Sequence, residues 1–293
     1  MRTPTIVVAT DGAPSGESTV RWAAREAESR GIRLRVVHVL EWDMNNARYD
    51  YYGQHFEAAR RLAETVTATA ADVARTAAPG AEITMATLIG HPTARLLEAA
   101  RGAELLVVGS RGHGGFADML LGSVSQRIAT HAPCPVVVVR GRPDPGGPIA
   151  VGVDDSEASA HVLDTAFGMA AGHGSDLVVI HAYLPAVPLY YQDVPANTIN
   201  TPGQDDAERD RVEEQLAPWR AKYPQVRVET LLSHDSAASV LTGVSHGTRM
   251  IVVGTRGHGV VAGTLLGSTG LQLLHHADCP VYLDRPRKEG DLS

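Results

Sequence analysis

Short apolar runs alternate with longer amphipathic stretches along the whole chain. In the first half the apolar runs lie at residues 5–10, 33–40, 82–88, 105–108 and 136–139, bounded by Gly, Pro or polar residues. Runs of this length and setting predict buried strands. Helical periodicity fills the intervals at residues 15–30, 57–78, 93–100 and 123–131. Strands that alternate with helices indicate a parallel α/β sheet with helices on both faces.

The pattern then starts again, which indicates two domains in tandem. Residues 140–148, RGRPDPGGP, are dense in Pro and Gly and are typical of a linker. Beyond them we predict strands at 149–154, 178–182, 227–232 and 250–254, a long helix at 206–223 and a short one at 236–246. A chain of 293 residues is long enough for two domains that each bury a core. We therefore expect domains at residues 1–143 and 144–293.

The strand at 105–108 leads into a loop rich in glycine. Gly109, Gly112, Gly122 and Ser123 form the pattern G-x2-G-x9-G-S, and Ser123 opens a predicted helix. Backbone N–H groups at a glycine turn and at a helix N-terminus bind anions, and serine hydroxyls add donors. The loop therefore predicts a phosphate site between a strand and a helix.

The second half carries the same loop at the same spacing. It runs from Gly254 through Gly257 to Gly267 and Ser268, and 254 minus 109 gives an offset of 145. An arginine and a histidine recur at matched positions in the two loops, as Arg111, His113, Arg256 and His258. Glycines that served only strand-to-helix turns would leave this repeated spacing unexplained. We therefore favour a ligand site in each half.

Composition and charge exclude several classes of protein. With 44% hydrophobic and 20% charged residues, the chain has the balance of an ordinary globular protein. The formal charge is 26 minus 33, or −7, which argues against a nucleic-acid-binding surface. No apolar run approaches the ~18 residues that a membrane span needs, and the N-terminus leads directly into a strand. We expect a cytoplasmic protein with neither a nucleic-acid nor a membrane partner.

The cysteines Cys134 and Cys279 lie at matched positions, each just before a final strand. In a cytoplasmic chain we expect small buried thiols at these positions, because disulfides are rare in reducing compartments. A bridge between the two domains is the alternative.

Several segments resemble the universal stress protein family. They are VATDGAPSG and VGVDDSEAS at the two repeat starts, GHPTARLLEAA in the first half, both glycine loops, and the CPV segments of the final strands. The aspartate, the loop and the CPV segment fall in the family's order in both halves, and the likeness covers essentially the whole chain. The chain therefore resembles the tandem two-domain form of the family's ATP-binding branch.

This resemblance implies a fold, a ligand and a mode of assembly. Each domain would be Rossmann-like, an open five-stranded parallel sheet in the order 3-2-1-4-5. The last strands would pair, either between the two domains or in a homodimer. The strands that end at Asp11 and Gly109 would flank the topological switch point, where open α/β sheets bind ligands. The implied protein takes part in a stress response and binds ATP, with Mg²⁺, at one site in each domain. Its nucleotide state would alter its association with other chains.

Carried over residue by residue, the resemblance implies two sets of binding residues. The first site would use Thr10, Asp11, Val39, Gly109, Arg111, Gly112, His113, Gly122, Ser123, Val124 and Ser125. The second would use Asp154, Ala182, Gly254, Arg256, Gly257, His258, Gly267, Ser268 and Thr269.

Some of these residues have structural alternatives. Asp11 and Asp154 could cap the helices that follow them, because Asp accepts hydrogen bonds from helix N–H groups. Their matched place beside the switch point favours contact with a ligand hydroxyl or amide. His113 and His258 could be exposed loop residues and nothing more.

Nothing in the loops indicates rapid ATP hydrolysis. The lysines Lys222 and Lys288 lie outside both loops, which excludes the P-loop mechanism with its G-x4-G-K-[ST] lysine. No general base stands at a fixed spacing near the expected γ-phosphate. We therefore expect binding with at most slow hydrolysis and name no catalytic residue. A nucleotide-free interaction scaffold and an ATP-hydrolysing enzyme are the alternatives.

Overall fold

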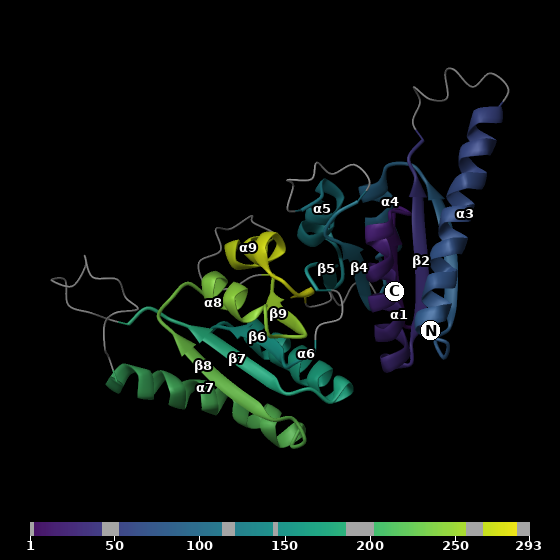
Figure 1. Ribbon diagram of the computed structural model, residues 1–293. Helices are drawn as coiled ribbons and strands as arrows, with labels where there is room; N and C mark the ends of the chain where they lie inside the picture. Colours follow the sequence, from purple (N-terminus) through teal and green to yellow (C-terminus); the bar gives the residue numbers. More distant parts are fainter. Residues whose placement is uncertain are drawn as a thin grey trace. The chain divides into compact units, whose positions relative to one another are not determined.

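A computed structural model describes residues 3–42, 53–112, 121–142, 146–185, 202–255 and 266–285 (Figure 1). The chain divides into two compact units. The first runs to Pro143 and also includes Arg285, and the second runs from Asp144 to Asp284. Arg285 belongs to the first unit because its guanidinium donates to the carbonyl oxygens of Ala129 at 2.8 Å and Thr130 at 3.3 Å.

The first unit alternates strands and helices. Its strands are β1 (Thr5–Thr10), β2 (Arg33–Leu40), β3 (Ile83–Ile89), β4 (Leu105–Gly109) and β5 (Val136–Val139). Its helices are η1 (Pro14–Gly16, 3-10), α1 (Glu17–Arg30), α3 (Gln54–Ala77), α4 (Pro92–Ala99) and α5 (Ser123–His131). The strands pair in parallel in the order β3-β2-β1-β4-β5.

The second unit repeats this arrangement. Its strands are β6 (Ile149–Val153), β7 (Leu177–Ala182), β8 (Val228–Ser233), β9 (Met250–Gly254) and β10 (Val281–Asp284). Its helices are α6 (Ala158–His173), α7 (Pro202–Lys222), α8 (Ala237–Val244) and α9 (Ser268–His276). The parallel strand order β8-β7-β6-β9-β10 is that of the first unit. The predicted fold, two tandem five-stranded parallel α/β domains, is confirmed.

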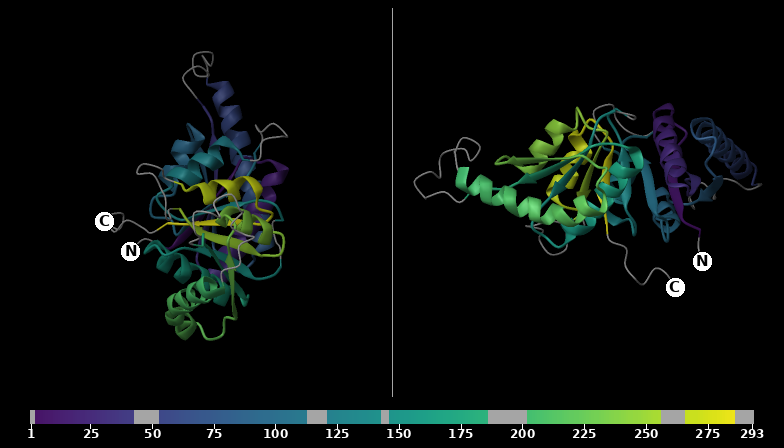
Figure 2. Two further views of the ribbon diagram at one scale, coloured as in Figure 1. Left: turned by 90° about the vertical axis from the view of Figure 1, so that its left-hand side faces the viewer. Right: turned by 90° about the horizontal axis from the view of Figure 1, so that it is seen from below.

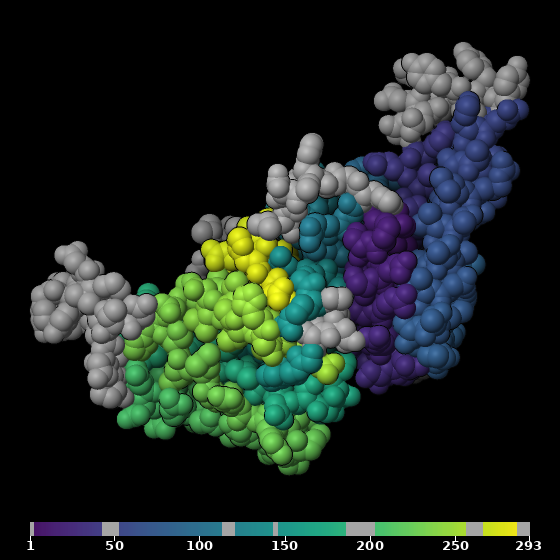
Figure 3. Space-filling view, viewed as in Figure 1, coloured from purple at the N-terminus to yellow at the C-terminus, as the bar shows by residue number. Residues whose placement is uncertain are grey.

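Helices cover both faces of each sheet. In the first unit α1 packs with α3 on one face, and α4 packs with α5 on the other (Figures 1 and 2). The space-filling view shows α1 and α3 side by side on the surface of that unit (Figure 3). In the second unit α6 packs with α7, and α8 with α9. Strands that are covered on both sides are continuously apolar, as in β5, where every residue is buried.

The structure also refines several expectations. Helix α7 begins at Pro202 and not at residue 206, because proline suits the first turn of a helix, where its missing N–H group is not needed. Both cysteines are buried and neither forms a disulfide, so the prediction of buried thiols is confirmed. Within the described ranges, no helix has an apolar stretch of the length that a bilayer crossing requires.

Candidate functional site

A cavity of about 480 Å³ lies at the carboxyl ends of the strands of the first unit. It lies where β1 and β4 are neighbours, and the segments that follow these strands lead to helices on opposite faces of the sheet. This is the topological switch point, where open α/β sheets bind ligands. Every predicted first-site residue that the structure describes lines the cavity: Thr10, Asp11, Val39, Gly109, Arg111, Gly112, Gly122, Ser123, Val124 and Ser125. His113 lies outside the described residues.

Asp11 holds the turn that follows β1. Its Oδ1 accepts a hydrogen bond from the backbone N–H of Ala13 at 3.0 Å. The cap residues of η1 and α1 are Ala13 and Gly16, and neither helix has a side-chain cap. Asp11 is therefore not a helix cap, and that alternative is wrong for the first unit. The carboxylate instead lines the cavity.

The N-terminus of α5 forms another wall of the cavity. Gly122 precedes the helix, and its N–H group donates to the carbonyl oxygen of Ser110 at 2.8 Å. The N–H groups of the first helical turn, from Ser123 to Ser125, have no acceptor within the helix. Because these residues line the cavity, the wall presents backbone donors and the positive end of the helix dipole.

The Ser125 hydroxyl does not extend this donor set. Its Oγ donates to the carbonyl oxygen of Gly109 at 2.6 Å, and the residue is only 8% exposed. The hydroxyl proton therefore joins the start of α5 to the end of β4. The expectation that this hydroxyl donates to a phosphate is corrected, although the backbone N–H of Ser125 stays at the cavity wall.

Sequence reasoning missed several residues of the cavity wall. Gly16 and Thr19 reach it from the start of α1, Glu41 follows β2, and Pro92 and Leu96 come from α4. A Cβ on Gly109 would lie 3.0 Å from Thr19 Oγ1, so α1 and β4 are in close contact at this point. Glu41 could have been found from its place directly after a strand end. The helical residues carry no local signal of that kind.

The second unit places its predicted residues in the same order. Asp154 follows β6, Ala182 ends β7, and Gly254 ends β9. Gly267 precedes α9, and its N–H donates to Thr255 at 3.1 Å, as Gly122 donates to Ser110. Ser268 and Thr269 then form the first turn of α9. Arg256, Gly257 and His258 lie outside the described residues. The two units thus share the backbone geometry of the glycine loop's end.

Asp154 has different surroundings from those of Asp11. Its Oδ1 accepts from the backbone N–H of Ser156 at 3.1 Å, from the Ser156 hydroxyl, and from the Ser159 hydroxyl at 2.8 Å. The residue before α6 is Glu157, and it has no side-chain cap, so Asp154 is not the cap of that helix either. The backbone N–H of Ser156 corresponds to that of Ala13, which donates to Asp11 Oδ1 in the first unit. At Asp154 the two serine hydroxyls donate to the same oxygen as this backbone group.

The ends of β7 and β8 carry a polar cluster. His234 Nε2 lies 2.9 Å from Asp205 Oδ1 and 3.1 Å from the Tyr183 hydroxyl. Tyr183 and His234 follow the paired residues Ala182 and Ser233. The matching positions of the first unit are the apolar pair Leu40 and Ile89.

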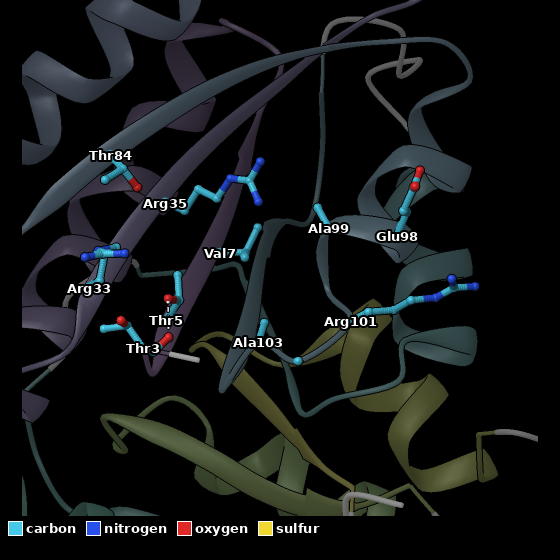
Figure 4. Close-up of a pocket in the computed structure, with 11 residues that line it drawn as sticks. Thr3, Thr5, Val7, Arg33, Arg35, Thr84, Glu98, Ala99, Arg101 and Ala103 are labelled. Atoms are coloured by element: carbon cyan, nitrogen blue, oxygen red, sulfur yellow. Dashed lines mark hydrogen bonds between the residues drawn. The ribbon is translucent and has the colours of Figure 1, made fainter. Parts of the chain in front are cut away.

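A larger cavity of the first unit lies at the opposite ends of its strands. It measures about 640 Å³ and is lined by Thr5, Arg33, Arg35, Thr84 and Arg101 among others. In Figure 4 the strand residues line one side of it, and Glu98 and Arg101 line the other. Arg33 Nε donates to Glu82 at 2.7 Å. The glycine loop follows the carboxyl end of β4, at the opposite ends of the strands, so this cavity is separate from the predicted site.

Comparison with known proteins places the chain in a family. The sequence model described as the universal stress protein family matches residues 3–140 and again residues 147–285. Universal stress protein Rv1996 of Mycobacterium tuberculosis is 30% identical over 300 residues, covering 96% of this chain and 94% of its own length. Universal stress protein Rv2623 of the same organism is 32% identical over 305 residues, covering 96% of both chains.

The fold has a counterpart among solved structures. A universal stress protein from Archaeoglobus fulgidus superposes with a TM-score of 0.72 at 18% identity, covering 97% of this chain and 99% of that one. At this identity the likeness concerns the fold alone. Together with the two matches of the family model, it shows that this chain belongs to the universal stress protein family, with two copies of the family's domain in tandem.

Proposed function

We propose that this protein is a nucleotide-binding regulator of a stress response, and that ATP binds in the cavity between β1 and β4. The observation that carries the proposal is that the Asp11 carboxylate and the N-terminus of α5 line the same cavity of about 480 Å³. That volume is within the usual range of ~300–1,000 Å³ for small-molecule sites. One wall suits a nucleoside and the other suits phosphates.

The nucleoside would occupy the part of the cavity near β2 and α4. Val37, Val39, Leu96 and Val108 give this part an apolar lining that suits a purine ring. The Asp11 carboxylate can accept hydrogen bonds from a ribose hydroxyl or an amino group. An acceptor beside apolar walls fixes the orientation of the nucleoside, because each polar group of the ligand then has one favourable place.

The phosphates would lie at the start of α5. The first-turn N–H groups and the helix dipole stabilise negative charge there without a lysine. Arg111 is exposed at the rim of the cavity and adds a positive charge. Mg²⁺ would accompany the triphosphate as its counter-ion. This set of groups binds phosphates but provides no general base, so we propose binding with at most slow hydrolysis.

Association would depend on the nucleotide. We propose that the last strands, β5 and β10, pair either between the two units or between two chains in a homodimer, and that bound ATP alters this association. The equivalent site of the second unit, around Asp154, Gly254 and Gly267, would bind a second nucleotide.

The proposal is tested on the purified full chain. We expect heat or acid denaturation to release adenine nucleotide, identified by chromatography and mass. Nucleotide-free protein should then bind ATP in calorimetric titrations. Absence of released nucleotide together with a dissociation constant above ~1 mM would favour the interaction scaffold. Rapid release of phosphate would favour the enzyme.

A further inference from the structure

Three side chains with metal-binding groups meet at one end of the second unit, on the α7 side of the sheet. His181 belongs to β7, Asp155 to the turn after β6, and Glu208 to α7. One donor atom from each lies within 4.8 Å of the others. His181 Nε2 is 3.6 Å from Glu208 Oε2. Figure 2 shows α7 running along the sheet of this unit, which brings Glu208 over the end of β7.

His181 is buried without the hydrogen bonds that an imidazole needs. The residue is 4% exposed, and its Nδ1 is buried with no hydrogen-bond partner in the described structure. Its Nε2 faces Glu208 at a distance beyond that of a hydrogen bond. A buried polar atom without a partner destabilises a protein unless something else binds it. The unpartnered Nδ1 lies on the other side of the ring from Nε2, so the atom placed to bind an ion beside the carboxylates is Nε2, which makes no hydrogen bond to Glu208 at 3.6 Å.

We propose that His181, Asp155 and Glu208 bind a divalent transition-metal ion of the zinc class. Zinc binds imidazole nitrogen and carboxylate oxygen at about 2.0–2.2 Å, which sets neighbouring tetrahedral ligands roughly 3.3 Å apart. The 3.6 Å between His181 Nε2 and Glu208 Oε2 is already near that separation. The Asp155 side chain is 51% exposed, so it can approach from the solvent side. Mg²⁺ and Ca²⁺ prefer sets made only of oxygen, so the imidazole favours zinc over them.

In this structure the guanidinium of Arg211 lies at the carboxylates that would bind the metal ion. Its Nη1 donates to both oxygens of Glu208, at 2.8 and 3.0 Å, and lies 3.8 Å from Asp155. The guanidinium is therefore a competitor for the same carboxylates. Its side chain is 56% exposed, so it can turn into solvent when a metal binds. A cavity of about 470 Å³, lined by Asp155, Arg211, Glu214 and Gln215, gives an ion access to this place.

The matching positions of the first unit do not carry this ligand set. Helices α3 and α7 end at Ala77 and Lys222, an offset of 145, and that offset also separates Ile83 from Val228 at the starts of β3 and β8. Glu208 and Arg211 therefore correspond to an alanine and a valine, Ala63 and Val66, and Asp155 corresponds to Gly12.

A direct contact supports this correspondence. A Cβ on Gly12 would lie 2.7 Å from Val66 Cγ1, so the first unit has an apolar contact where the second has the Asp155–Arg211 ion pair. His38, which matches His181, instead has its Nδ1 2.9 Å from the carbonyl oxygen of Thr10. The common fold therefore does not require the cluster. The proposed metal site does not depend on a bound nucleotide.

The test uses the nucleotide-free full chain. Co²⁺, titrated by its visible absorption, reports the ligand set, and Zn²⁺ is titrated by calorimetry in competition with it. We expect one site per chain without the charge-transfer band of a thiolate. The His181→Asn and Asp155→Asn variants should bind at least roughly tenfold more weakly, because even changes to the hydrogen-bond partners of metal ligands cost about tenfold to a hundredfold. Asp210→Asn, with the same loss of charge at an exposed position of α7, should bind like the wild type.

Two further results separate a metal site from a simple ion-pair cluster. Arg211→Ala should bind the metal more tightly, because it removes the competing cation. Zn²⁺ should raise the melting temperature of the wild type and of Arg211→Ala but not that of His181→Asn. The proposal is overturned if neither ion binds, or if the His181→Asn, Asp155→Asn and Asp210→Asn variants bind alike. It is also overturned if Arg211→Ala weakens binding.

Discussion

The carboxylate of Asp11 lies directly against Gly112. A Cβ built on Gly112 would lie 2.4 Å from Asp11 Oδ2, which is closer than two such atoms can approach. Gly112 has no positive φ angle, so its backbone conformation does not itself require glycine. Glycine is required at this position because the Asp11 carboxylate leaves no room for a Cβ. The strand end at β1 and the glycine loop after β4 are therefore coupled through one contact inside the candidate site.

The first prediction is that Gly112→Ala weakens ATP binding by displacing Asp11. A lost hydrogen bond to a charged group costs ~1.5–3 kcal/mol, or roughly tenfold to a hundredfold in affinity. Calorimetric titration measures the change. Gly172→Ala is the control, because in the described structure no atom outside its own stretch of α6 lies within 4 Å of its Cβ position. In the Asp11→Asn background the Gly112→Ala effect should shrink, since contacting residues are not additive. Equal effects in both backgrounds would show that Gly112 does not act through Asp11.

A second prediction concerns Gly122, at the start of α5. A Cβ there would have ordinary contacts, 3.6 Å from the carbonyl oxygen of Ser110 and 4.0 Å from Ser125 Oγ. Gly122→Val should therefore fold, with a melting temperature a few degrees lower, because valine is a poor residue before a helix. Its isopropyl group would cover the first-turn N–H groups and abolish ATP binding at this site. Retained affinity would remove the start of α5 from the phosphate site.

How far the sequence predicts this protein depends on whether a feature is local. Apolar runs located β1, β2, β5 and β9 with their ends, because the buried middle of each strand is apolar and polar residues or glycine bound the run. The start of α7 was missed because Pro202 and Gly203 are also typical of a loop. The glycine loop was found because its spacing repeats.

Contacts between distant residues had no such signal. Ser125 and Gly109 are 16 residues apart, and only the fold shows that the serine hydroxyl donates to that carbonyl. Thr19 and Leu96 reach the cavity because α1 and α4 pack at the strand ends, and helical periodicity does not say which apolar or polar residue will do so. The direction of a side chain is set by tertiary packing, which the sequence pattern does not report.

A third prediction follows from the Ser125 contact. Ser125→Ala removes the hydrogen bond to Gly109 and leaves a buried carbonyl without that partner. We expect the free energy of unfolding to fall by ~1 kcal/mol, while ATP affinity stays within about twofold, which is less than ~0.5 kcal/mol. Urea denaturation and calorimetry measure the two quantities. Ser123→Ala, at the exposed neighbouring position, should leave stability unchanged. A tenfold loss of affinity in Ser125→Ala with unchanged stability would reverse this assignment.

The last prediction is that the first site binds ATP more tightly than the second. The two starts of the phosphate-side helix differ less than the sequence suggests. Gly270 of α9 replaces Ser125, but the Ser125 hydroxyl is already bonded to Gly109, so its absence removes no phosphate donor. The difference that remains is at the nucleoside end.

There the Asp154 carboxylate already accepts hydrogen bonds from the protein. Asp154 Oδ1 accepts from Ser156 and Ser159, so a ribose hydroxyl that approaches this oxygen would compete with protein donors. Displacing one such bond costs ~1.5–3 kcal/mol when a charged group takes part, which is roughly tenfold to a hundredfold in affinity.

The test compares ATP titrations of two matched variants of the full chain. Asp11→Asn should remove the tight phase of an ATP titration, and Asp154→Asn should leave that phase intact and alter only the weak one. Asp→Asn keeps the size and shape of the side chain at both positions. A difference between the two variants therefore reports the roles of the two sites in ATP binding. Thermal melting of each variant checks that both units stay folded. Loss of the tight phase in Asp154→Asn, or two phases of equal affinity in the wild type, would contradict the prediction.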